Sequence, residues 1–91
     1  SRRTAIYYSR MEDKMNFNDK MEEIRLLNQF NLKSKAYGLK IHEQDASSGS
    51  VSAAARLFHK GLTDHLDGGY LTDLGIVAAG HAQALLKILE D

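Results

Sequence analysis

The sequence predicts a small α+β domain in the order helix, strand, helix, two-stranded hairpin and long helix. Three segments place apolar residues at the three- and four-residue spacing of a helix, and a glycine-rich turn separates two short β-favouring runs between the last two of them. The 91 residues are enough for one domain with one modest core. Because the chain has no cysteine, disulfides and thiolate metal sites are excluded.

The hairpin is expected within residues 62–72. Gly61 follows the second predicted helix and suits the left-handed conformation of a Schellman ending, in which Leu62 packs on Leu57. Asp67-Gly68-Gly69 supplies the positive φ angles of a tight hairpin loop. A helix, a hairpin and a further helix form the second half of a winged-helix domain, so we predict a small winged-helix-like domain. The alternative is another small α+β unit that contains a hairpin.

The first helix is expected to begin at Phe17, with Asn18 or Asp19 as its cap, and to close at Phe30-Asn31-Leu32. Residues 39–42 alternate apolar and polar side chains, which predicts a short strand beside the hairpin. The apolar stripe of the first helix comprises Met21, Ile24, Leu26, Leu27 and Phe30.

The second helix is expected to follow a polar loop at residues 43–49 and to end at Lys60. Its candidate caps are Asp45, Ser47, Ser48 and Ser50, and its expected buried stripe is Val51, Ala54, Ala55, Leu57 and Phe58.

The last helix is expected over residues 73–89, with Thr72 or Asp73 as its cap. Its apolar content exceeds what two short helices and three short strands are expected to cover, so we predict a homodimer through this helix. The apolar stripe comprises Leu74, Val77, Ala78, His81, Leu85, Ile88 and Leu89, and the candidate interface residues are Val77, His81, Leu85 and Ile88.

Residues 1–14 show no sustained apolar period and are expected to lie outside the single domain at 15–91, as a native extension or as a segment left from cloning. Met11 and Met15 are both candidate start residues. The alternative is a basic arm that contacts a partner. No apolar run approaches the roughly 20 residues of a membrane span, and a cytoplasmic location is the default expectation.

No catalytic constellation is present in the sequence, so we expect neither an enzyme nor a cofactor or metal site. The four histidines, His42, His59, His65 and His81, include no pair four residues apart on one helix that would suit a metal. His81 is expected in a core or an interface, and the others at the surface.

The charge balance weighs against a dedicated DNA-binding domain. Residues 15–91 hold eight basic and ten acidic side chains, whereas such domains usually carry a basic excess for phosphate contacts. The candidate contacts to nucleic acid or to a partner are the basic residues Lys33, Lys35, Lys40, Arg56 and Lys60.

The runs Lys60-Gly61-Leu62, 67–72 and Leu74-Gly75 are similar to the wing region of winged-helix regulators. Those domains place two helices between the first strand and the wing, whereas residues 43–60 have room for one. Residues 15–91 also resemble a small bacterial family of unknown function, whose members are sometimes labelled as related to an inhibitor of DNA binding. That resemblance favours Met15 as the start and transfers no functional residues. It rests on Leu26-Leu27, Phe30-Asn31-Leu32, 53–58, 60–62, 67–75 and 81–86.

Two functions follow from these observations. The first is a non-enzymatic regulatory or protein-interaction module on a winged-helix-like scaffold. The alternative is a DNA-binding transcriptional regulator that uses helix 50–60 and hairpin 62–72, with weak DNA binding.

Overall fold

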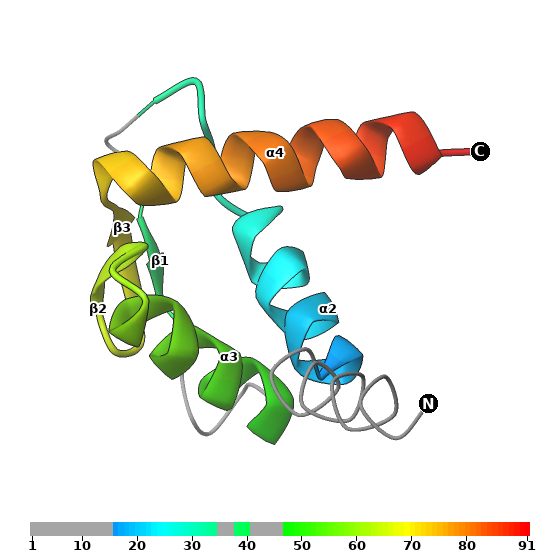
Figure 1. Cartoon of the computed structure of the whole chain (residues 1–91). Helices are drawn as coiled ribbons and strands as arrows, with labels where there is room; N and C mark the ends of the chain where they lie inside the picture. The colour runs from blue at the N-terminus through cyan, green and yellow to red at the C-terminus, as the bar shows by residue number, and fades with distance from the viewer. Residues whose placement is uncertain (1–15, 35–37, 41–46) are drawn as a thin grey trace, which may run out of the picture.

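The structure, a computed structural model, describes residues 16–34, 38–40 and 47–91. It confirms the α+β class and the predicted order of elements (Figure 1). The predictions for residues 1–14, for Lys35 and for His42 fall outside the described residues. The elements are α2 (Phe17–Leu27), β1 (Leu39–Lys40), α3 (Ser48–His59), β2 (Thr63–His65), β3 (Gly68–Leu71) and α4 (Asp73–Leu89).

Helix α2 begins at Phe17, as the sequence predicts, but its cap differs and it ends earlier than expected. Asn16 is its cap, because the Asn16 side chain accepts a hydrogen bond from the backbone N–H of Asp19 at 3.1 Å; the expected caps Asn18 and Asp19 were therefore wrong. The helix ends at Leu27, three residues before Phe30. The predicted stripe is also partly wrong, since Met21 is exposed and the buried residues of the helix are Glu23, Leu26 and Leu27.

Helix α3 packs on α2 through a face of small residues. Ser47 caps it by accepting the backbone N–H of Ser50 at 3.2 Å, which selects one of the four expected caps. The buried residues are Ala53, Ala54 and Leu57, so the prediction is confirmed for Ala54 and Leu57 and missed Ala53. It was wrong for Val51, Ala55 and Phe58, which are only half-buried. Alanine allows the two helix backbones to approach closely, and these side chains form the core with Leu26 and Leu27.

The Schellman ending of α3 is confirmed. The backbone N–H of Leu62 donates to the carbonyl of Leu57 at 2.9 Å, and that of Gly61 donates to the carbonyl of Phe58 at 2.9 Å. Gly61 has a φ of 77°, which is the left-handed region that favours glycine. This ending turns the chain directly from α3 into β2.

The sheet has three antiparallel strands in the order β1-β3-β2. Leu39 lies opposite Gly69 and Thr63 lies opposite Leu71, so β1 pairs with the hairpin as the sequence predicts. The register shifts between Thr63 and His65, and Gly68 and Gly69 both have positive φ angles. The glycines therefore allow both the turn and the bulge.

Helix α4 crosses over the C-terminal end of α2 and runs on past it (Figure 1). Thr72 caps the helix, because its hydroxyl oxygen accepts the backbone N–H of Gly75 at 3.0 Å while donating to the Gly61 carbonyl at 2.6 Å. The buried residues of α4 are Gly75, Ala79 and Ala82. The side of α4 that faces the core is therefore built from its smallest residues.

Candidate interaction surface

The outer face of α4 consists of large apolar residues that the described domain leaves exposed. Leu74 is 59% exposed, Val77 55%, Leu85 49% and Ile88 79%, and His81 is exposed among them. We call these five residues the outer stripe. The sequence predicts that they share one face, and the structure turns that face away from the core.

Two contacts fix α4 in this rotation. The backbone at Gly75 packs so closely on the carbonyl of Leu62 that a Cβ there would overlap it. The side-chain amide of Gln83 donates to the carbonyls of Leu27 and Phe30, at 3.1 and 2.8 Å. Because these carbonyls lie where α2 ends, Gln83 satisfies groups that have no partner within the helix. The small inner face is thus held against the domain, and the outer stripe faces outward.

The outer stripe lies on a segment without formal charge. Between Asp73 at the start of α4 and Lys87 in its last turn, residues 74–86 contain no Asp, Glu, Lys or Arg. An exposed helix face of a monomeric protein normally carries such residues. A contiguous apolar face of this kind is typical of a surface that another molecule covers.

A groove beside the C-terminal half of α4 extends this apolar surface towards α2. Its lining includes Leu85, which also belongs to the outer stripe, so the two surfaces are continuous. Arg25 and Asn28 are its polar residues. The full lining is Met21, Ile24, Arg25, Asn28, Leu85, Leu86 and Leu89.

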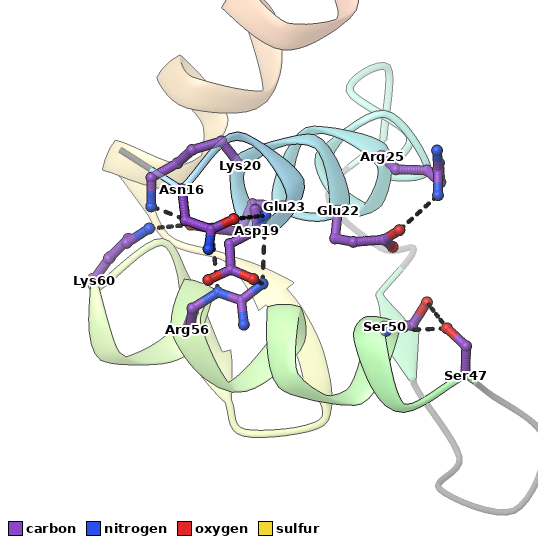
Figure 2. A network of polar contacts seen from close by, with 10 residues as sticks. All are labelled: Asn16, Asp19, Lys20, Glu22, Glu23, Arg25, Ser47, Ser50, Arg56 and Lys60. Atoms are coloured by element: carbon purple, nitrogen blue, oxygen red, sulfur yellow. Dashed lines mark hydrogen bonds and ion pairs between the residues drawn. The ribbon is translucent and has the colours of Figure 1, made fainter. Parts of the chain in front are cut away.

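Two of the five candidate basic contacts are held in ion pairs between α2 and α3 (Figure 2). Arg56 donates from Nε to one carboxylate oxygen of Glu23 at 3.1 Å, and Lys60 donates from Nζ to the other oxygen. Lys20 adds a third cation at 3.4 Å, and Arg56 also donates to the backbone carbonyl of Asp19 at 3.3 Å. We call Glu23 and these three cations the Glu23 cluster.

Glu23 is only 4% exposed, and both of its oxygens accept hydrogen bonds from cations. Burial alone raises the pKa of Glu23, but the hydrogen bonds from Lys60 and Arg56 outweigh it and bring the pKa below its ordinary value. The carboxylate is therefore ionised and paired at neutral pH. Its arrangement joins two helices, and it leaves neither oxygen free to abstract a proton from a substrate.

The remaining basic candidates do not join this cluster. Lys33 is exposed, and its backbone N–H donates to the Asn31 side chain at 2.9 Å. Lys40 lies in β1, where the structure describes its backbone only, and Lys35 lies outside the described residues. The described part of the chain thus brings Arg56 and Lys60 together, but around an acidic partner of the same chain.

The histidines within the described residues are exposed. His65 contacts the Asp64 carboxylate through Nδ1 at 2.7 Å, and the hydrogen bond that this carboxylate accepts raises the pKa of His65. Asp64 also accepts the backbone N–H of Tyr70 at 2.8 Å, and this bond is the main cause that lowers the pKa of Asp64. The pair braces the hairpin. Among the described residues, no group of three or more His, Cys, Asp or Glu side chains is arranged to hold a metal ion.

The sequence analysis did not predict the roles of two residues, Glu23 between α2 and α3 and Gln83 between α4 and the end of α2. Glu23 looks like a solvated residue beside the apolar stripe of its helix, and its partners lie 33 and 37 positions away. Gln83 reaches carbonyls 56 and 53 positions away. The local signal for Gln83 is a polar amide within the segment 74–86, which contains no Asp, Glu, Lys or Arg.

Fold and surface together define a small α+β domain that carries an uncovered apolar helix face. Within the part of the chain that the structure describes, no helix is long and apolar enough to cross a membrane.

The chain belongs to a family of unknown function (DUF5669), whose model matches residues 15–90. This match agrees with the resemblance of residues 15–91 to a family without an assigned function. No curated protein and no solved structure shows a significant match to the chain.

Proposed function

We propose that this protein is a non-enzymatic protein-interaction module whose binding surface is the outer stripe of α4. The observation that carries the proposal is the rotation of α4: its buried residues are Gly75, Ala79 and Ala82, whereas the large apolar residues of the outer stripe are exposed. Small residues on the inner face give a tight fit to the domain, so the large side chains contribute little to holding the domain together. Their contribution to stability comes when a partner covers them.

The same reading accounts for the Glu23 cluster. Arg56 and Lys60 neutralise a buried carboxylate of their own chain, so they offer less positive charge to a phosphate backbone than free cations would. We therefore favour a protein partner over DNA, and a regulatory role through that partner. A winged-helix-like scaffold is compatible with both functions, because the order of elements includes a hairpin that follows a helix.

The test uses a double variant, Val77→Glu with Leu85→Glu, which places two charges in the outer stripe. Both residues are about half exposed, so the variant is expected to keep the circular dichroism spectrum of the wild type. Wild-type chain on a support should retain one defined protein from an extract of its own cells, and the double variant should not. The matched control is Ser52→Glu, which adds a charge at an exposed position of α3.

A second measurement addresses the DNA alternative. The 91-residue chain is titrated with fluorescent random-sequence duplex DNA at low salt and again at higher salt. We expect no binding that falls steeply with salt. Salt-sensitive binding that weakens in Arg56→Ala with Lys60→Ala would replace the proposal with the DNA-binding function. Equal retention of the same protein by wild type and double variant would remove α4 as the binding surface.

A further inference from the structure

We infer that the partner of the outer stripe is a second copy of this chain, packed with its α4 antiparallel to the first and with His81 on the two-fold axis. This inference rests on the proposed function and names its partner. Four observations lead to it: the spacing of the stripe, its angular position, the charges at its ends and the groove beside it.

The spacing of the outer stripe is symmetric about one residue. Leu74 and Ile88 lie seven positions before and after His81, and Val77 and Leu85 lie four positions before and after it. His81 is also the midpoint of the helix Asp73–Leu89. When two such helices pack antiparallel about a two-fold axis at His81, Leu74 meets the partner's Ile88 and Val77 meets the partner's Leu85. The surface is therefore self-complementary, as an isologous contact requires.

The angular position of the stripe suits a straight helix pair. At about 100° per residue, the four apolar residues lie within about 40° of His81. This is the width of a seam between two packed helices. Ala79, which is fully buried, lies on nearly the opposite side of the helix. Two copies thus meet through their α4 helices, with the rest of each domain on the outside.

The charges at the ends of α4 favour the antiparallel orientation. Asp73 is in the first turn and Lys87 in the last, so antiparallel packing brings Asp73 to the same end and flank as the partner's Lys87. Glu90 follows the helix and approaches the positive end of the partner's helix dipole. In a parallel pair, the two Asp73 residues would share one end of the dimer and the two Lys87 residues the other, each on opposite flanks. The opposite charges would then not be paired.

The size of the contact sets the expected affinity. A 17-residue helix is about 25 Å long, and a pair of that length buries less than the roughly 800 Å² per partner of a standard interface. The groove that includes Met21 and Leu89 adds apolar surface beside the point where the partner's Leu74 arrives. We therefore expect a dimer that forms in the micromolar range and dissociates on dilution.

The experiment uses single cysteines, which report cleanly because the native chain has none. Under mild oxidation, His81→Cys should form a disulfide-linked dimer, since position 81 meets itself on the axis. Val77→Cys and Leu85→Cys are the matched controls. Each lies about 12 Å along the axis from its own copy, which is beyond disulfide reach. An equimolar mixture of these two variants should form the linked heterodimer.

A gain-of-function variant guards against loss through misfolding. His81→Leu adds apolar contact on the axis and should tighten the dimer about tenfold, as measured by sedimentation equilibrium. The wild type should shift from 10.2 kDa towards twice that mass as its concentration rises.

The outcomes separate this inference from the proposed function. Self-linkage of Val77→Cys and Leu85→Cys at the rate of His81→Cys would indicate parallel packing and overturn the inference. A 10.2 kDa monomer at millimolar concentration would also overturn it. The proposed function would survive that second result if wild-type chain still retained a protein that Val77→Glu with Leu85→Glu does not.

Discussion

The α2–α3 contact and the outer face of α4 are opposites: the first buries charged groups, and the second exposes apolar ones. Between α2 and α3, a carboxylate is buried at Glu23 and is paired with cations from both helices. On α4, Leu74 and Ile88 face solvent along a segment without formal charge. The first surface is closed to other molecules, because the buried carboxylate in it is already paired with cations of the same chain. The second is open, because the described domain leaves its large apolar side chains about half exposed or more.

The difference teaches where the domain obtains its stability and where it can act. A buried charge with all its partners in place holds two helices in register but offers little to a ligand. An exposed apolar face adds little to folding and gains free energy when covered. Substitutions in the two regions should therefore separate stability from association.

The largest effect is expected at Leu57. This side chain is 2% exposed in the core, and Leu57→Ala should lower the free energy of unfolding by about 3 kcal/mol. Leu85→Ala removes the same atoms from a side chain that is 49% exposed, and should cost under about 1 kcal/mol in dilute solution. Urea denaturation of both variants measures the two losses in the free energy of unfolding. Equal losses would show that the outer stripe belongs to the core.

The Glu23 cluster provides the next effect. Glu23→Gln removes the counter-charge of Lys60 and leaves Arg56 with only the longer pair to Asp19 at 3.8 Å, and should lower the free energy of unfolding by about 2 kcal/mol. This value lies below the usual range for a buried pair, because the side chains of Arg56 and Lys60 remain 28% and 41% exposed. Glu22→Gln is the control. It breaks an exposed pair with Arg25 and should cost under about 0.5 kcal/mol.

The same cluster predicts how stability depends on pH. The pKa of Glu23 is lower in the folded chain than in the unfolded chain, so its contribution is present above the unfolded value and is lost as pH falls through the folded value. The unfolded value is close to 4.5. Wild type should therefore lose stability on acidification below that pH more steeply than Glu23→Gln. Parallel curves for the two proteins would contradict the assignment.

Local chemistry made much of the fold predictable from the sequence. Gly61 and Leu62 specify the end of α3, Gly68 and Gly69 specify the hairpin, and Thr72 specifies the start of α4, because each acts on neighbours within a few residues. The first residue of α2, Phe17, was predicted, but its cap was missed, since Asn16, Asn18 and Asp19 are all chemically suitable caps.

The candidate site was less predictable, for a physical reason. Periodicity identifies the residues that share a face of a helix, but it does not say which face packs inward. In α4 the close approach at Gly75 and the fit of Ala79 outweigh the larger burial that Val77 would provide. The Glu23 cluster was invisible for a different reason. Its members come from two helices whose packing brings together residues more than 30 positions apart.

The smallest effects are expected from the two glycines of α4. Gly75 lies on the side of the helix that packs against the domain, and the position of Gly80 has open space around it within the described part of the chain. A Cβ at Gly75 would overlap the backbone carbonyl of Leu62, which cannot move without disturbing the end of α3. A Cβ at Gly80 would meet nothing within 4 Å among the described residues outside its own helix backbone. Gly75→Ala should therefore lower the free energy of unfolding by about 1–2 kcal/mol, despite the better helix propensity of alanine. Gly80→Ala should raise it by up to about 1 kcal/mol. Thermal denaturation at low protein concentration, where the chain is monomeric, distinguishes the two signs. Stabilisation by both substitutions would mean that α4 does not pack on Leu62, and the rotation that turns the outer stripe towards solvent would then lack its main support.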